Sequence, residues 1–478
     1  MHRGFVVGLL ALTGCAQLFG IDETTSPGAG SGVTLSIDRV SIGATVAHAP
    51  QDITNETAQF LVGDATSLVP NSAVVSAPGT WSSDIPTGTP LAEFTLPDIP
   101  MDATHLWELP SRAMKGNLVA FEHQNATAPS DTSQIALSVT NLPPYNGELL
   151  RVYSVGTWMF HNLAGAEVPA LMATSIAATI PYNMFAPVSS AVAPTKITAS
   201  DVVLVLEYTG NALTGVLQAT PFDQTDATDT ISGALTAVTN DKTLTVPLPT
   251  DLATRYSGVR PAVGAPATSW SIVAAPGAMV GNSLGPQLLA GSPVVGDTMI
   301  SATYGDPFES LGWPAIFTLN TSASRTYTLN AVAVTLSASL TTFSDAATND
   351  GELAAGLPTV ILVGTTQLNS DGQLVTIDPL APVTVSFLAD KPTNTIYVAD
   401  VYELVVNGTA YDRNLVTSAV ATEPSFVFPA GTLESGHTYV VRAGCYLGGH
   451  TAAASGDLQT NTFPIARGLL DSGVFTVQ

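Results

Sequence analysis

The sequence predicts an all-β protein of three to four tandem antiparallel β-sandwich domains, which follow a cleaved signal and a flexible tether. Apolar and polar residues alternate with a period of two, as in Val33–Asp38 and Leu91–Leu96, and this is the period of a half-buried strand. The chain contains 40 Gly and 33 Pro, which are residues that end strands and form turns. Helical patterns are few and short, at Asp251–Tyr256 and Glu352–Gly356. No fixed repeat period is present, which argues against a solenoid or a propeller.

The N-terminus has the layout of a secretory signal. Arg3 precedes an apolar run from Phe5 to Leu12, and small residues follow it. This run is shorter than the roughly 20 residues that a membrane-spanning helix needs. The four residues Leu12-Thr13-Gly14-Cys15 resemble the lipobox of bacterial lipoproteins. An ordinary cleaved signal, with a cysteine at this place by chance, is the alternative.

The lipobox resemblance implies a location. It implies that the signal, residues 1–14, is removed, that Cys15 is lipidated, and that the protein is held on the cell envelope. Ala16 follows in place of an aspartate, which implies the outer membrane rather than the inner one. Residues 15–32 continue as a Gly- and Ser-rich flexible linker.

Interruptions near residues 130, 250 and 350 divide the remaining chain into four segments. We expect a β-sandwich at 33–130, a second at 131–250, an irregular β domain at 251–356, and a final sandwich at 357–478. The strands expected after the first segment are Gln134–Val139, Glu148–Val155, Val202–Tyr208, Leu213–Ala219, Thr243–Val246, Met299–Thr303, Thr326–Leu340 and Thr359–Val363.

The last segment carries the clearest strand pattern. Asn407-Gly408 between two alternating runs is a hairpin signal, because both residues tolerate positive φ. Leu433, Gly436 and Tyr439 resemble the leucine, glycine and tyrosine that precede the sixth strand of fibronectin type III domains. The resemblance implies a fibronectin-like or immunoglobulin-like sandwich in which the tyrosine hydroxyl bonds the backbone upstream. Phe387 is the nearest substitute for the family's tryptophan.

The charge balance excludes several partners. Only 11% of residues are charged and the net charge is −24, so phosphate backbones and anionic headgroups are repelled. We therefore expect no nucleic-acid partner. The most apolar stretch, Val168–Ile180, is interrupted by Pro169 and is too short to span a membrane. The expected partners are the membrane, through lipid, and envelope proteins or glycans.

Few residues carry a catalytic pattern. Gly281-Asn282-Ser283-Leu284-Gly285 spells the G-x-S-x-G nucleophile elbow, but that motif needs a strand before it and a helix after it. Cys445 lies within a predicted strand, where a thiol packs as a small apolar group. No motif for a cofactor is present, and we expect none.

Several carboxylates and histidines are candidates for metal ligands or acid–base groups. Asp223, Asp226 and Asp229 recur every third position, whereas calcium loops use alternate positions, so a solvated turn and a calcium site are both open. Asp306 and Glu309 are either an acid–base pair or surface carboxylates. The seven histidines are scattered without the spacing of a zinc site.

One aromatic cluster could bind a ligand. Tyr153, Trp158, Phe160 and His161 fall within nine residues, and exposed rings on a β-sandwich can stack on sugars. Aromatic residues at alternating strand positions are otherwise core residues. The sequence thus favours a non-catalytic envelope lipoprotein for binding, adhesion or scaffolding. The alternatives are a glycan-binding accessory lipoprotein and a secreted serine hydrolase centred on Ser283.

Overall fold

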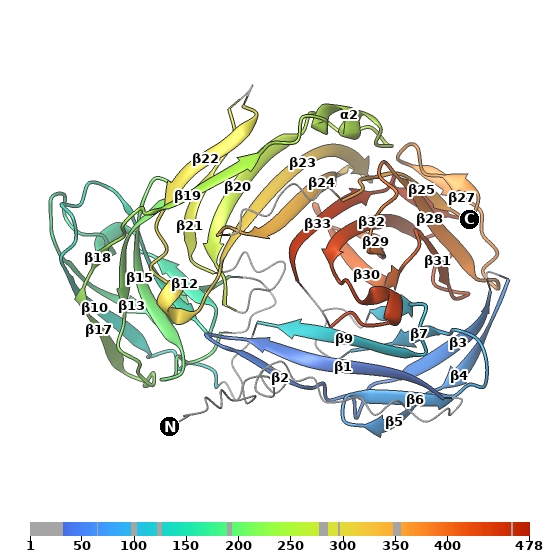
Figure 1. Ribbon diagram of the computed structural model, residues 1–478, viewed down its shortest axis with the longest axis horizontal. Coiled ribbons are helices and arrows are strands. Elements are labelled where there is room, and N and C mark those ends of the chain that lie inside the picture. Colours follow the sequence, from blue (N-terminus) through green and yellow to red (C-terminus); the bar gives the residue numbers. More distant parts are fainter. Residues whose placement is uncertain are drawn as a thin grey trace, which may run out of the picture.

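The computed structural model describes residues 32–64, 66–96, 103–121, 127–188, 194–276, 285–294, 297–347, 355–459 and 462–478. Strands dominate these ranges, and α2 (Leu252–Ser257) is the one α-helix within them. The predicted all-β class is confirmed. None of the helices in the described ranges has the length and apolarity needed to cross a membrane. Figure 1 shows the segments arranged one after another in a ring, so that the last segment lies against the first.

The first segment is a sandwich of two layers. One layer has the strand order β2-β1-β6-β5, with β9 parallel to β1 on its other edge. The second layer has the order β4-β3-β7-β8. The core between the layers holds Leu35, Phe60, Trp81 and Phe94, which are all buried. The strands are β1 (Gly32–Ile42), β2 (Val46–Pro50), β3 (Ala58–Asp64), β4 (Ser67–Ser72), β5 (Val74–Ala77), β6 (Thr80–Asp84), β7 (Leu91–Phe94), β8 (Thr104–Glu108) and β9 (Ala113–Ala120).

The second segment packs a three-stranded sheet, β13-β10-β17, on a layer with the order β14-β12-β11-β15-β16-β18. Their shared core includes Ile135, Val152, Ile180 and Val205. The strands are β10 (Gln134–Thr140), β11 (Leu149–Val155), β12 (Met159–Asn162), β13 (Ile176–Pro181), β14 (Ala186–Pro187), β15 (Val202–Thr209), β16 (Ala212–Gln218), β17 (Thr228–Ala234) and β18 (Thr236–Ala237).

The third segment contains one correction to the expected strands. Thr326–Leu340 is not a single strand but a hairpin, whose strands meet at Leu329 and Val332. The reversal uses Asn330 (φ 49°) and Ala331 (φ 68°), and two positive φ values fit a two-residue type I′ turn. Asn-Ala lacks the glycine by which such turns are recognised in a sequence. The strands are β20 (Ala267–Ala274), β21 (Gln287–Gly291), β22 (Met299–Tyr304), β23 (Ala315–Leu329) and β24 (Val332–Asp345). β22 pairs antiparallel with β19 (Lys242–Pro247), which comes from the end of the second segment.

The fourth segment is a sandwich of the sheet β26-β25-β28-β31 and a layer built around β30-β29-β32-β33, with β34 beside β32 and β27 beside β34. The predicted hairpin is present: Asn407 pairs with Ala410, and Gly408 (φ 64°) opens the turn. The strands are β25 (Pro358–Val363), β26 (Thr366–Gln367), β27 (Gln373–Val375), β28 (Val383–Ala389), β29 (Ile396–Asn407), β30 (Ala410–Ala421), β31 (Ser425–Phe428), β32 (Thr438–Gly449), β33 (Thr462–Asp471) and β34 (Phe475–Val477).

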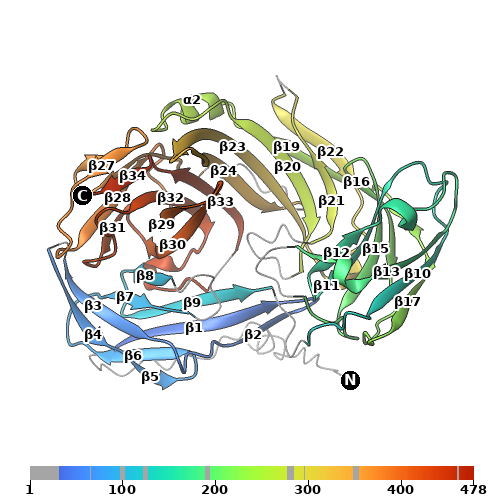
Figure 2. The same cartoon turned by 180° about the vertical axis from the view of Figure 1, so that it is seen from behind.

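A single twenty-stranded sheet runs through all four segments. It passes from the second segment to the third where β16 pairs with β21, and from the third to the fourth where β24 pairs with β33. It then passes to the first segment, because β30 pairs in parallel with β8 over Thr104–Glu108. Figure 2 shows β8 beside β30, with β7 on the other side of β8.

The layer formed by β3, β7 and β8 is buried on both faces. Phe60 and Phe94 point into the core of the first segment, whereas Leu61, Leu91 and Leu106 belong to the core of the fourth. A continuous apolar run such as Phe60-Leu61-Val62 suits a strand that is covered on both sides. The first and fourth segments therefore share one sheet and cannot separate without exposing apolar surface.

Buried ion pairs stabilise the fold both between segments and within the fourth one. Arg255 of α2 lies 2.6 Å from Asp390, and both side chains are largely buried. Asp471 at the end of β33 is 1% exposed and pairs with Arg413 of β30 and Arg442 of β32. Buried charges of this kind are stable only when they are paired and hydrogen-bonded.

Candidate functional site

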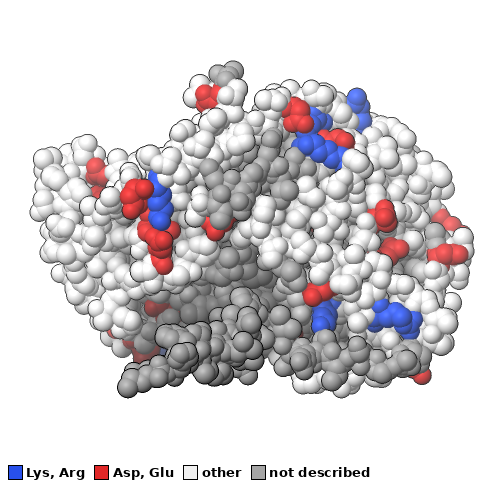
Figure 3. Space-filling view, in the orientation of Figure 1, with Lys and Arg blue, Asp and Glu red and all other residues white. Residues whose placement is uncertain are grey.

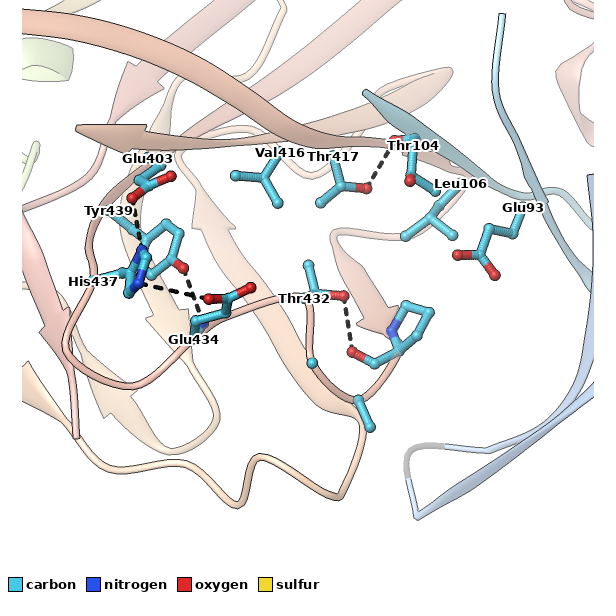
Figure 4. Close-up of a pocket in the computed structure, with 13 residues that line it drawn as sticks. Glu93, Thr104, Leu106, Glu403, Val416, Thr417, Thr432, Glu434, His437 and Tyr439 are labelled. Atoms are coloured by element: carbon cyan, nitrogen blue, oxygen red, sulfur yellow. Dashed lines mark hydrogen bonds and ion pairs between the residues drawn. The ribbon is translucent and has the colours of Figure 1, made fainter. Parts of the chain in front are cut away.

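A cleft of about 360 Å³ lies where the fourth segment meets the first. Figure 4 shows Glu403, His437 and Glu434 at one end and Glu93 at the other, with Thr417 and Thr104 between them. The residues that line it are Glu93, Thr104, Leu106, Glu403, Val416, Thr417, Pro429, Ala430, Gly431, Thr432, Glu434, His437 and Tyr439.

One end of the cleft is a histidine between two carboxylates. His437 Nδ1 lies 2.7 Å from Glu403 Oε1, and His437 Nε2 lies 3.6 Å from Glu434 Oε2. Glu403 comes from β29, while Glu434 and His437 come from the connection between β31 and β32. The imidazole is 43% exposed. The pairing holds the β31–β32 connection against β29.

Tyr439 holds this connection in place through a hydrogen bond. Its side chain is 2% exposed, and its hydroxyl accepts a hydrogen bond of 2.9 Å from the backbone N–H of Glu434, five residues upstream. This is the backbone contact that the Leu433-to-Tyr439 pattern implied. Burial raises the pKa of Tyr439, so the hydroxyl keeps its proton. The aromatic ring stacks near His437, with ring centroids 6.4 Å apart.

The other wall of the cleft comes from the strand pair that joins the two segments. Thr417 of β30 donates a hydrogen bond of 2.9 Å to the carbonyl oxygen of Thr104 on β8. Glu93 on β7 accepts a hydrogen bond from Gln59 of β3. A second hollow of about 530 Å³ shares Glu93 and Thr104 with the cleft and extends over β3 and β5. The cleft therefore depends on the association of the first and fourth segments.

The chemistry of the cleft is acidic. Three carboxylates and one imidazole line it, and the lining contains no Lys, Arg, Ser or Cys. The carboxylates accept hydrogen bonds from hydroxyl or amine groups, but the lining holds no serine or cysteine nucleophile. Among the described residues, no group of three or more His, Cys, Asp or Glu side chains is placed to hold a metal ion. The geometry suits non-covalent binding of polar groups.

The aromatic cluster proposed as a platform is packed inside the protein, which corrects that hypothesis. Trp158 is 0% exposed, and its indole N–H donates a hydrogen bond of 2.6 Å to the carbonyl oxygen of Ile42. Tyr153 is 2% exposed and meets Trp158 edge-on. His161 is buried and lies 2.7 Å from Glu167. Phe160 is half-buried beneath the Arg151 guanidinium, which lies 4.9 Å from the ring centroid.

The physical reason for this packing is the junction between segments. β11 and β12 carry these side chains toward a core that also receives residues from β1 and from the third segment. An indole held between three segments cannot present a face to a sugar. The closeness in sequence that suggested a platform therefore reflects side chains that pack in a core.

The three aspartates of the acidic turn do not converge on a common point. Asp223 accepts a hydrogen bond from the backbone N–H of Ala199, and Asp226 lies 2.7 Å from Lys196 Nζ. Asp229 accepts hydrogen bonds from the backbone N–H and the hydroxyl of Thr225. Each carboxylate thus has its own local partner.

Asp306 and Glu309 likewise have separate partners. Glu309 pairs with Lys242 at 3.0 Å, and Asp306 accepts a hydrogen bond of 3.0 Å from the backbone N–H of Phe308. Burial raises the pKa of Asp306 from its ordinary value. These contacts are typical of a capped turn.

Of the two cysteines, Cys445 lies on β32 and is 0% exposed. Burial raises the pKa of its thiol to about 12, which keeps it protonated and unreactive at neutral pH. Cys15 and the signal lie outside the described residues, and so does Ser283. Within the described residues, the strands before and after Ser283 are β20 and β21, which pair antiparallel in one sheet. A nucleophile elbow instead joins a strand to a helix.

The cleft was not found from the sequence. Glu93, Glu403 and Glu434 come from strands and loops that are far apart in the chain, and only the β8–β30 pairing brings them together. The one available signal was the Leu433–Tyr439 stretch, because His437 lies within it. That stretch indicated a fold element rather than a site.

Comparisons with known proteins add little. No protein-family model matches the chain, and no curated protein matches it either. Among solved structures, it is similar to Escherichia coli alpha-2-macroglobulin activated by porcine elastase, at 10% identity and a TM-score of 0.15, over 93% of this chain and 43% of that chain. The chain thus spans less than half of that protein's length.

A second solved structure is a tetra-tandem repeat in the extending region of a large adhesion protein. It is 13% identical with a TM-score of 0.10, over 91% of this chain and 99% of that chain. At these TM-scores neither similarity bears on the fold or the function of this protein.

Proposed function

We propose that the protein is a cell-envelope lipoprotein, anchored by lipid at Cys15, whose body is a non-catalytic scaffold that binds an envelope partner. The observation that carries this proposal is the twenty-stranded sheet that joins all four segments. A rigid body built on strand pairing suits the presentation of fixed surfaces, whereas enzymes of the α/β-hydrolase type place their nucleophile on a strand-to-helix turn. The anchor rests on the Leu12–Cys15 lipobox pattern.

The surface composition supports the same proposal. Charged side chains are sparse over the face seen in Figure 3, in keeping with a chain of which 11% is charged. Two of the buried charged side chains, Arg255 and Asp471, are engaged in ion pairs that stabilise the fold. The cleft between the first and fourth segments is the recessed surface at which a partner would be held. Its carboxylates favour a partner with amine or hydroxyl groups.

The anchor is tested by Cys15→Ser, with Cys445→Ser as the matched control. Cys15→Ser removes the acceptor thiol, so palmitate labelling should vanish and the protein should leave the membrane fraction. The Cys445→Ser variant should still be labelled by palmitate and should stay in the membrane fraction. Labelling that persists in Cys15→Ser would place the anchor elsewhere.

The binding role is tested by a photo-crosslinking amino acid placed at Thr432, inside the cleft, and at Asp412, which is exposed on β30 outside the cleft lining. A discrete adduct in living cells from Thr432 alone is the expected result. Equal adducts from both positions, or none from Thr432, would argue against the cleft as the binding surface.

The absence of serine catalysis is tested separately. A fluorophosphonate probe reacts only with an activated serine, so the wild-type protein should not be labelled. Labelling of the wild-type protein that disappears in Ser283→Ala would contradict the scaffold proposal and indicate a serine hydrolase.

A further inference from the structure

The second segment presents an apolar tip to solvent. Leu171 is 73% exposed and Met172 is 69% exposed, at the centre of the connection that leads into β13. The tip lies in Val168–Ile180, the most apolar stretch of the chain. Soluble proteins tolerate single exposed apolar side chains, but two large adjacent ones at a turn are unusual for a surface that meets only water.

The backbone holds this tip in a fixed shape. The N–H of Met172 donates a hydrogen bond of 2.8 Å to the carbonyl oxygen of Tyr145, and the N–H of Tyr145 donates one of 3.0 Å to the carbonyl oxygen of Ala173. Met172 has a φ of 67°, in the left-handed region that favours glycine or asparagine. The turn therefore carries a long apolar side chain where glycine would be less strained.

The stretch of sequence that carries the tip is uncharged. No Asp, Glu, Lys or Arg occurs in residues 168–195. The acidic residues nearest in sequence on the two loops, Glu148 and Glu167, each accept a hydrogen bond from a backbone N–H. Leu380 is equally apolar and 88% exposed, but it follows Asp378, whose carboxylate caps its turn. An acid beside an apolar tip opposes its entry into lipid. Asp378 is two residues from Leu380, whereas Glu167, the nearest acid in sequence, is four residues from Leu171.

We propose that Leu171 and Met172 insert into the surface of the bilayer to which the protein is tethered. This inference rests on the proposed lipid anchor at Cys15, because the tether keeps the body close to lipid. The 16 residues 16–31 have a root-mean-square reach of roughly 20–24 Å and a maximum of about 55 Å. A net charge of −24 disfavours anionic headgroups, so the contact is apolar and fits a zwitterionic surface.

Because the body is tethered to the membrane, insertion of two apolar side chains is sufficient to orient it. A tether raises the effective concentration of the tip at the membrane, so a weak insertion becomes the preferred orientation of the body. Transfer of a Leu or Met side chain from water to an apolar phase favours the buried state by about tenfold or more. Insertion at this tip would fix which face of the body points toward the membrane and which face points toward a partner.

The test uses residues 16–478 with an N-terminal histidine tag, attached to phosphatidylcholine vesicles through a nickel-chelating lipid. This tether replaces Cys15, so the result does not depend on natural lipidation. An environment-sensitive dye is attached at Leu171→Cys and, as the matched control, at Leu380→Cys; Cys445 is buried and stays unlabelled. We expect a blue-shifted emission and several-fold stronger quenching by spin-labelled lipid at position 171 than at position 380.

Equal quenching at the two positions, or no change at position 171 on tethering, would overturn the proposal. Met172→Gly supplies a second measurement, because it relieves the positive φ while removing the apolar side chain. It should keep or raise the melting temperature, yet reduce the quenching at position 171. If quenching is unchanged, the side chain does not contact lipid. Failure of palmitate labelling at Cys15, with insertion still observed here, would remove the natural anchor but not the tip.

Discussion

Asp471 offers the sharpest test of how the segments are held together. Its carboxylate is 1% exposed and lies 2.8 Å from Arg442 Nε and 3.3 Å from Arg413 Nη1. It also accepts a hydrogen bond of 3.0 Å from the backbone N–H of Ser337 on β24. One side chain therefore connects β24, β30, β32 and β33, which lie on both sides of the junction between the third and fourth segments.

Asp471→Asn keeps the shape of the side chain but removes its charge. Two arginines would then remain without their shared counter-charge, and breaking a buried pair in this way costs about 3–5 kcal/mol. Urea unfolding followed by far-ultraviolet circular dichroism measures the loss. Asp412→Asn is the matched control, because Asp412 is exposed on the neighbouring β30 and should change stability by less than about 0.5 kcal/mol.

The pH dependence gives an independent check with a defined sign. Burial opposes ionisation of Asp471, but Arg442 and Arg413 outweigh it, so the pKa of this carboxyl lies below its ordinary value. A depressed folded-state pKa stabilises the protein above the unfolded pKa of about 3.9, and this stabilisation is lost as the pH falls through the folded-state pKa. The gap between wild type and Asp471→Asn should therefore be full near neutral pH and shrink in acid. A loss no larger than that of Asp412→Asn, or a gap that does not change with pH, would refute the reasoning.

Three further predictions follow from single side chains. Trp158→Ala should lower the free energy of unfolding by about 3–5 kcal/mol, measured by urea denaturation, because it empties a buried site shared by three segments; a nearly neutral effect would contradict the core position. Tyr439→Phe removes the acceptor for the N–H of Glu434 and should cost about 0.5–1.5 kcal/mol, seen as a lower melting temperature. The thiol of Cys445 should not react with a maleimide in the native protein but should react fully in urea, and rapid native labelling would mean that β32 opens.

Local sequence patterns were sufficient to predict the fold class and the positions of many strands. The apolar run Val202–Tyr208 predicted β15, which the structure gives as Val202–Thr209. Asp251–Tyr256 predicted α2 to within one residue. The hairpin predicted at Asn407-Gly408 is present, with its turn one residue later at Gly408-Thr409, because Asn407 pairs with Ala410. The error at Thr326–Leu340 has a local cause, because Asn330-Ala331 forms a tight turn without the glycine that usually marks one.

The candidate site could not be predicted from local sequence patterns, because it is formed by contacts between residues that are far apart in the chain. Trp158 fits either a platform or a core by its spacing alone, and its burial is decided by Ile42, 116 residues away, which accepts its indole hydrogen bond. The cleft with Glu403, Glu434 and His437 needs Glu93 from another segment to complete it. The sequence shows which side chains can bind or react, but it does not show which of them lie close together in the folded protein.

The sequence by itself determined that this chain forms strands, that its cores are apolar and its turns rich in Gly and Pro, and that its lipobox resemblance favours the envelope. These are local properties, since a period of two or a turn residue acts within a few positions along the chain. Only the tertiary structure decided that four expected domains share one sheet, because the pairing of β8 with β30 joins residues more than 300 positions apart. Strand pairing uses backbone groups that every residue carries, so the sequence specifies which strands form far better than which edges meet.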